Sequence, residues 1–90
     1  MSKIKVEFRG VFREITKRSS TEVDFKEGAT ICDVLSDLKR RYGKEFAETI
    51  TLEHYMIIRI NGTDCRKLED LNTPVNTGDR LSISHLVAGG

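Results

Sequence analysis

Residues 30–43, TICDVLSDLKRRYG, predict a helix with a single apolar face. Thr30, followed three positions later by Asp33, forms a capping-box pattern that starts a helix by satisfying its first free amides. Gly43 allows the left-handed ending that helices favour. Apolar residues recur every three or four positions between these ends and so share one side of the helix: Ile31, Val34, Leu35, Leu38 and Tyr42.

Before this helix, alternating apolar and charged residues predict two strands. In residues 3–9, the apolar side chains Ile4, Val6 and Phe8 occupy every second position, which is the period of a half-buried strand. Residues 21–25, TEVDF, alternate in the same way. We expect the two segments to pair as antiparallel strands joined by a loop.

After the helix, residues 44–52 show no clean period and predict a short helical turn or loop. Residues 55–60, YMIIRI, are rich in β-branched side chains and predict a strand. Asn61-Gly62 then predicts a hairpin turn, because both central residues of a type I′ turn need positive φ.

The hairpin predicts a short return strand at residues 63–66, and a turn at Gly78-Asp79 precedes the last predicted strand, residues 80–85. The resulting order is strand, strand, helix and three strands. The fold class is therefore α+β, with four to five strands and one main helix.

Composition restricts the class of protein. The 90 residues are 38% hydrophobic and 32% charged, with 15 Lys+Arg against 14 Asp+Glu and a net charge of +1. A domain of this size has too few residues to surround an enclosed pocket easily, so a free-standing enzyme is disfavoured. A near-neutral chain also lacks the field that drives nonspecific nucleic-acid or membrane-surface binding, so we expect neither partner.

Location and cysteine chemistry follow from short segments. Residues 1–9 carry a charge at nearly every second position, unlike an export signal, and the longest apolar run, residues 55–58, is too short for a bilayer. We therefore expect a cytoplasmic protein with reduced thiols. Cys32 is expected to be buried beside the apolar stripe, and Cys65 to be partly exposed, which leaves a redox or persulfide role open.

The four candidate metal ligands, Cys32, His54, Cys65 and His85, are far apart in sequence, unlike the close ligand pairs of structural zinc sites. No metal site is expected.

The sequence ends in Leu86-Val87-Ala88-Gly89-Gly90. A frayed end or a cloning remnant would explain two terminal glycines without any function. The functional interpretation is that glycine, lacking Cβ, threads a narrow channel and presents its carboxylate to a partner's catalytic centre. Five extended residues reach about 17 Å. A carboxylate is a poor acyl donor, so a partner must first activate it, most simply by adenylation.

The order of elements, Asn61-Gly62, the GDRL of residues 78–81 and the VAGG of residues 87–90 together resemble the MoaD/ThiS family of ubiquitin-like sulfur carriers. The resemblance covers the whole chain and is strongest to small subunits of molybdopterin synthase and to small archaeal modifier proteins. It implies an α+β, ubiquitin-like β-grasp domain at residues 1–85, in which a mixed sheet of four to five strands packs on one main helix. The first and last strands would lie parallel at the sheet centre, and residues 86–90 would form a flexible tail.

The resemblance also implies a division of labour. An E1-like enzyme of the MoeB or ThiF type would use ATP to adenylate Gly90, and sulfur transfer would convert the adenylate to a thiocarboxylate, with Gly89 beside it. The chain would bind no cofactor and would not be an enzyme, because a MoaE-like large subunit supplies the catalytic residues. Many family members carry Pro-Pro where this chain has His85-Leu86, which leaves the identity of the sulfur acceptor open.

Three other functions remain open at the level of sequence. As a protein modifier, the chain would be joined through its activated Gly90 to lysine amines of other proteins. As a sulfur carrier with a different acceptor, it would supply sulfur for thiazole synthesis or tRNA thiolation. A plain β-grasp binding module, such as an RNA-binding one, would not use Gly90 at all.

The strand at residues 55–60 also predicts a docking surface. If Met56, Ile58 and Ile60 face the helix, then Tyr55, Ile57 and Arg59 lie on the outer sheet face. Tyr55 and Ile57 would then form an apolar patch with Leu86, beside Val87 and Ala88 of the tail, for the activating enzyme and the acceptor. The alternative is that Ile57 merely suits a strand.

Overall fold

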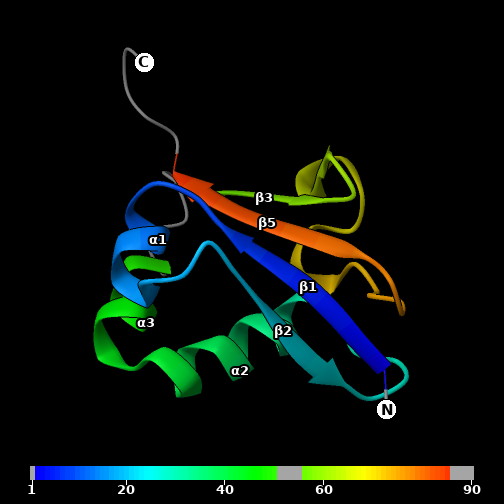
Figure 1. Cartoon of the computed structure of the whole chain (residues 1–90). Coiled ribbons are helices and arrows are strands. Elements are labelled where there is room, and N and C mark those ends of the chain that lie inside the picture. The colour runs from blue at the N-terminus through cyan, green and yellow to red at the C-terminus, as the bar shows by residue number, and fades with distance from the viewer. Residues whose placement is uncertain (1, 51–55, 86–90) are drawn as a thin grey trace.

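The computed structural model describes residues 2–50 and 56–85, in which a five-stranded mixed sheet is covered on one face by helices (Figure 1). In chain order the elements are β1 (Ser2–Phe8), α1 (Val11–Thr16), β2 (Ser20–Phe25), α2 (Ile31–Tyr42), α3 (Lys44–Ile50), β3 (Met56–Ile60), β4 (Thr63–Asp64), two 3₁₀ turns, η2 (Cys65–Lys67) and η3 (Asp70–Asn72), and β5 (Arg80–His85). No helix among these residues is long and apolar enough to cross a membrane.

The strands lie in the order β2-β1-β5-β3-β4. β1 and β5 are parallel, with Val6 opposite Leu81 and Phe8 opposite Ile83, whereas the other neighbouring strands are antiparallel. Because β1 and β5 run in the same direction, their carboxyl ends lie at the same end of the sheet (Figure 1). The expected α+β fold, a β-grasp with its first and last strands parallel in the sheet, is confirmed.

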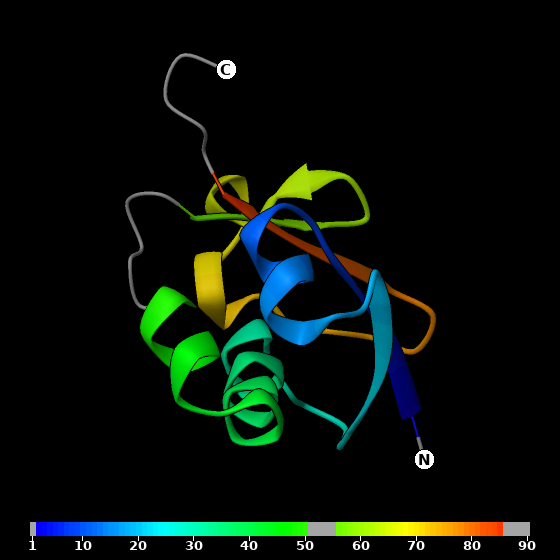
Figure 2. The ribbon, with the colours of Figure 1, turned by 60° about the vertical axis from the view of Figure 1, so that its left-hand side comes forward.

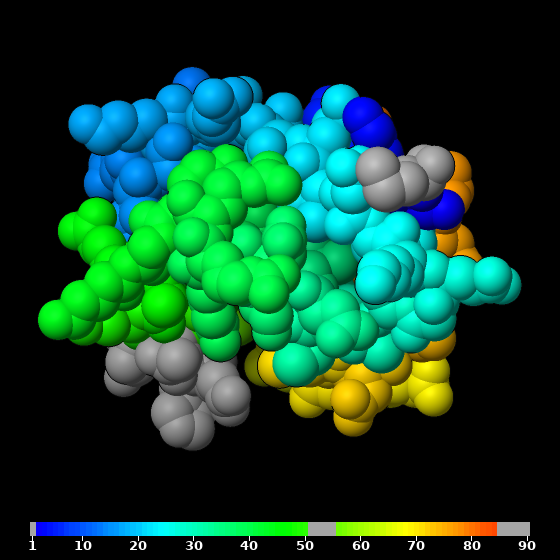
Figure 3. All heavy atoms as spheres, turned by 90° about the horizontal axis from the view of Figure 1, so that it is seen from below, coloured from blue at the N-terminus to red at the C-terminus, as the bar shows by residue number. Residues whose placement is uncertain are grey.

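α2 forms where the capping pattern predicts it. The Thr30 amide donates a 2.9 Å hydrogen bond to the Asp33 carboxylate, and the Thr30 hydroxyl lies 3.2 Å from the same oxygen. The predicted stripe is buried, apart from half-buried Tyr42, and packs on the inner sheet face with residues of α1 and α3 (Figure 2). On the helix side of the molecule, α2 and α3 form much of the surface, and β2 lies beside α2 (Figure 3).

α1 was not expected, because a loop was predicted between the first two strands. It starts after Gly10, whose φ is 58°, and ends at Lys17, whose φ is 60°. Phe12 is fully buried, and the Thr16 hydroxyl donates a 2.9 Å hydrogen bond to the Phe12 carbonyl. A helix of six residues contains fewer than two turns, too few for its period to show in the sequence.

Residues 44–52 were predicted to form a short helical turn or loop, and α3 shows that their first seven residues are helical. Phe46 and Ile50, four positions apart, are both buried on its inner side. Leu52 lies outside the described residues.

The Asn61-Gly62 turn is confirmed, with φ of 52° and 86°. The return strand is shorter than predicted, because β4 ends at Asp64. The Asp64 carboxylate accepts a 3.0 Å hydrogen bond from the Arg66 amide and so starts the η2 turn.

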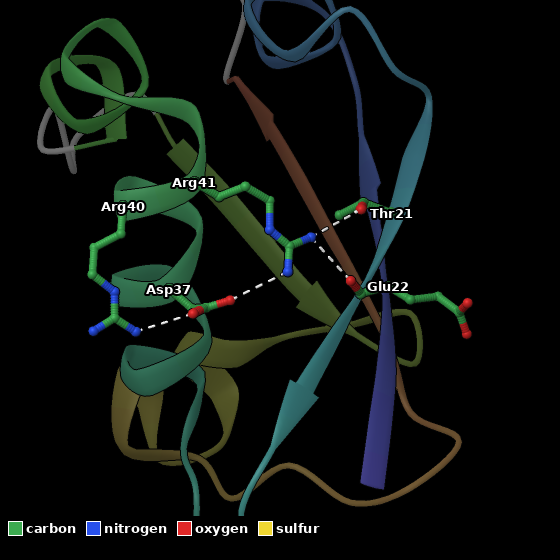
Figure 4. Close-up of polar contacts among 5 residues, drawn as sticks. All are labelled: Thr21, Glu22, Asp37, Arg40 and Arg41. Carbon is green, nitrogen blue, oxygen red and sulfur yellow. Dashed lines mark hydrogen bonds and ion pairs between the residues drawn. The ribbon is translucent and has the colours of Figure 1, made fainter. Parts of the chain in front are cut away.

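Arg41 joins the end of α2 to strand β2 (Figure 4). Its guanidinium donates to the Thr21 hydroxyl at 3.1 Å and to the Glu22 carbonyl at 3.0 Å, and it pairs with Asp37 at 3.4 Å. Arg40 pairs with the other oxygen of Asp37 at 3.0 Å. Two of the basic residues that end α2 therefore interact within the protein.

Candidate functional site

Strand β5 connects the folded domain to the predicted reactive end. Gly89 and Gly90, with residues 86–88, lie outside the described residues, as does Tyr55. What the structure describes is the attachment point: β5 pairs with β1 on one side and β3 on the other, and His85 lies opposite Met56. The predicted tail therefore follows directly from a strand within the sheet rather than from an edge strand.

β5 is held firmly along its length. Leu81 and Ile83 are fully buried, and the Arg9 amide donates a 3.0 Å hydrogen bond to the Ile83 carbonyl. α1 packs beside the end of this strand (Figure 1). Backbone pairing on both sides and buried alternate side chains fix β5 as far as Ile83, and pairing with β3 alone continues to His85.

The outer face of the sheet carries both apolar and polar side chains where the structure describes it. As expected, Ile58 and Ile60 are buried and Arg59 is exposed, but Ile57 is only half-exposed, opposite Ser84. The described part of the predicted docking surface therefore consists of Ile57, which is partly covered, and Arg59, which is exposed. The contributions of Tyr55 and Leu86 stay predictions.

An open groove of about 840 Å³ runs along β5 on this outer face. Its lining includes three small residues, Ser82, Gly62 and Gly78, and four longer side chains. Three of these come from strands, Glu7 on β1, Arg59 on β3 and Arg80 on β5, and the fourth, Arg9, directly follows β1. In register, Glu7 and Arg59 lie on either side of Ser82. We call this feature the β5 groove.

The β5 groove is cationic. Arg80 pairs with Glu7, with Nε 3.5 Å from the carboxylate oxygen. Arg9 and Arg59 form no ion pair with any residue in the described parts of the chain. Of these groove residues, only Arg59 was among the predicted docking residues. The alternation in residues 3–9 already directs Glu7 and Arg9 away from the core, but local sequence does not show that β5 separates β1 from β3.

The two cysteines have the reverse of the expected environments. Cys32 is exposed, because position 32 is rotated about 100° around α2 from the buried Ile31. Cys65 is buried in the η2 turn, and its Sγ lies 3.7 Å from the Asp70 carboxylate. Burial, followed by the negative charges of Asp70 and Asp64, raises the pKa of the Cys65 thiol from 9.0 to about 11.

These environments predict selective alkylation. At pH 8 a thiol with a pKa of about 11 is ionised in roughly one molecule in a thousand, and the thiolate is the nucleophile. Iodoacetamide is therefore expected to modify Cys32 at least tenfold faster than Cys65 in the folded protein, as measured by peptide mass spectrometry. In urea the two rates should converge. Equal rates in the folded state would contradict the burial of Cys65.

No group of three His, Cys, Asp or Glu side chains suited to a metal ion occurs among the described residues. Of the four residues weighed as ligands, His54 lies outside them. Cys32 and Cys65 lie on separate elements, one exposed on α2 and the other buried in η2.

The mixed sheet, its central parallel pair and the single capped main helix define the ubiquitin-like β-grasp class of proteins. Within this class the chain belongs to the ThiS family, whose model matches residues 6–90.

Three solved structures show the same fold. The HVO 2177 protein of Haloferax volcanii has a TM-score of 0.83 and 26% identity, over 99% of this chain and 87% of its own. A Pyrococcus furiosus protein proposed as subunit 1 of molybdopterin converting factor has a TM-score of 0.76 and 21% identity, over 97% and 100%. Small archaeal modifier protein 1 of Methanosarcina acetivorans has a TM-score of 0.80 and 24% identity, over 100% and 98%. A search of curated proteins found no match.

Family membership defines the general role. Proteins of this family are small ubiquitin-like sulfur carriers or modifiers that are not catalytic themselves. They act with E1-like enzymes and with acceptor proteins. The chain is therefore a carrier or modifier and not an enzyme.

Proposed function

We propose that this chain is a sulfur carrier whose reactive group is the carboxylate of Gly90, and that its acceptor is the precursor of the molybdenum cofactor. The observation that supports the proposal most directly is the match to the ThiS family, which extends through residue 90 and so includes Gly89-Gly90. The firmly paired β5 that precedes this segment is a suitable base for a reactive end.

The chemistry belongs to partners, and the chain is their substrate. An E1-like enzyme of the MoeB or ThiF type joins the Gly90 carboxylate to AMP from ATP and releases pyrophosphate. A sulfur donor then displaces AMP, so that a thiocarboxylate replaces the carboxylate. A MoaE-like large subunit receives the tail and transfers the sulfur. ATP is consumed by the activating enzyme, and we place the protein in the cytoplasm, where ATP is supplied.

A protein modifier is the second candidate function. The shared fold of small archaeal modifier protein 1 favours it, because the same activated Gly90 that accepts sulfur would also react with a lysine amine. The two functions differ only in the nucleophile that displaces AMP. Delivery of sulfur to a thiazole or to tRNA differs from our proposal in the acceptor alone.

Mass spectrometry of the intact protein tests the carrier function. The chain is incubated with its E1-like enzyme, ATP and a sulfur source. We expect the mass increase of one oxygen replaced by sulfur, located at Gly90 by fragmentation. Absence of this exchange while the enzyme thiolates another carrier would refute the proposal.

The acceptor is tested with the thiocarboxylated protein. Adding a MoaE-like subunit and the cofactor precursor should return the chain to its carboxylate as sulfur enters the precursor. Transfer to tRNA or to a thiazole precursor alone would redirect the proposal, and lasting isopeptide conjugates in cells would identify a modifier.

A further inference from the structure

We propose that the β5 groove receives an acidic segment of the activating enzyme and so positions that enzyme beside the strand that leads to Gly90. This inference rests on the proposed function, because it assigns the activating enzyme as the occupant. Recognition at this groove is mainly electrostatic, whereas the docking patch predicted from the sequence is apolar.

The shape of the β5 groove suits an extended segment. Ser82 projects outward from β5 between the longer side chains of Glu7 on β1 and Arg59 on β3, so the surface is lower at Ser82 than on either side, and Arg80 stands beside this low surface on the same strand. Gly62 and Gly78 extend this low surface toward the turns at the far end of the sheet. An enzyme segment lying in the groove would follow β5 toward its carboxyl end, where the tail begins.

Charge identifies the chemistry of the segment. Three guanidinium groups line the groove against the single carboxylate of Glu7, which pairs with only one of them. Arg9 and Arg59 have no ion pair in the described parts of the chain, since Asp64, which lies opposite Arg59 in register, pairs with Arg66 instead. Both guanidinium groups can therefore bind carboxylates, which arginine does through two parallel hydrogen bonds. Aspartate and glutamate side chains are the complementary groups on a protein.

A nucleic acid fits this face less well. The neighbouring strand β2 carries exposed Glu22 and Asp24, which would repel a phosphate backbone that extends beyond the groove. Among the described residues, no aromatic side chain lines the groove to stack on bases.

The test removes the two unpaired charges without changing side-chain bulk greatly. In the double variant Arg9→Gln and Arg59→Gln, we expect the dissociation constant of the complex with the activating enzyme, and the KM of adenylation, to rise about tenfold or more, with kcat unchanged. For the wild-type protein both constants should rise with salt concentration, and this dependence should be weaker in the variant. Thermal unfolding confirms that the variant is folded.

A matched control removes two charges elsewhere. Lys26, in the turn between β2 and α2, and Lys44, at the start of α3, are exposed and lie outside the groove lining. Lys26→Gln with Lys44→Gln should leave the dissociation constant within about twofold of wild type, because screening weakens charges far from the contact.

The outcomes separate the two proposals. Arginine-dependent binding without adenylation would refute the carrier function alone. Adenylation with an unchanged dissociation constant in the Arg9 and Arg59 variant would refute the groove alone. Displacement of the enzyme by a single-stranded RNA that binds the wild-type protein more tightly would also overturn the groove proposal, in favour of nucleic acid.

Discussion

One alanine added after Gly90 is expected to abolish thiocarboxylate formation and to leave the free energy of unfolding unchanged. The addition moves the terminal carboxylate by about 3.5 Å and gives its residue a Cβ. Reacting atoms must approach to about 3–3.5 Å, so a displacement of this size removes the carboxylate from its productive position. Intact-protein mass spectrometry measures the reaction, and urea unfolding measures stability.

Two further variants separate the causes. A glycine added after Gly90 changes the length alone, so its failure would assign the loss to position, whereas its activity would assign the loss to the added Cβ. An alanine added before Met1 extends the chain at its other end and should react normally. Thiocarboxylate formed at the wild-type rate on the added alanine would contradict the role of Gly90.

The strands and the main helix were predictable because each one repeats its pattern several times. The alternation through residues 3–9, the Asn61-Gly62 turn and the stripe of α2 are local signals, and the structure confirms all three. α1 was missed, and α3 was predicted only as a short helical turn or loop, because helices of six and seven residues depend on distant contacts. Phe12 and Phe46, one from each, pack edge to face at 5.7 Å, although they lie far apart in sequence.

The β5 groove could be predicted only in part. Period two directs Arg9 and Arg59 away from the core, but their convergence depends on β5 lying between β1 and β3. That order is a property of long-range pairing and is not present in any short window of residues. Cys65 was misjudged for a related reason: the expected strand ends at Asp64, and the η2 turn directs the thiol inward.

Phe46→Ala is expected to lower the free energy of unfolding by about 3–5 kcal/mol, the usual cost of removing a buried aromatic ring. Phe46 is fully buried, and its ring centroid lies 6.1 Å from that of Phe8, 5.7 Å from Phe12 and 5.6 Å from Tyr42. It therefore joins α3 to β1, α1 and α2. Because small domains are stable by about 5–15 kcal/mol, this single change would remove a large share of the total.

Urea unfolding with matched variants tests this expectation. Phe46→Leu retains much of the apolar volume and should cost about 1–2 kcal/mol, while Glu45→Gln, at the exposed neighbouring position, should cost less than about 0.5 kcal/mol. If Phe46→Ala lowers the free energy of unfolding no more than Phe46→Leu does, the space left by the ring is filled by neighbouring side chains and the ring contacts contribute little. If Phe46→Ala lowered the free energy of unfolding only as much as Glu45→Gln, α3 would unfold separately from the sheet.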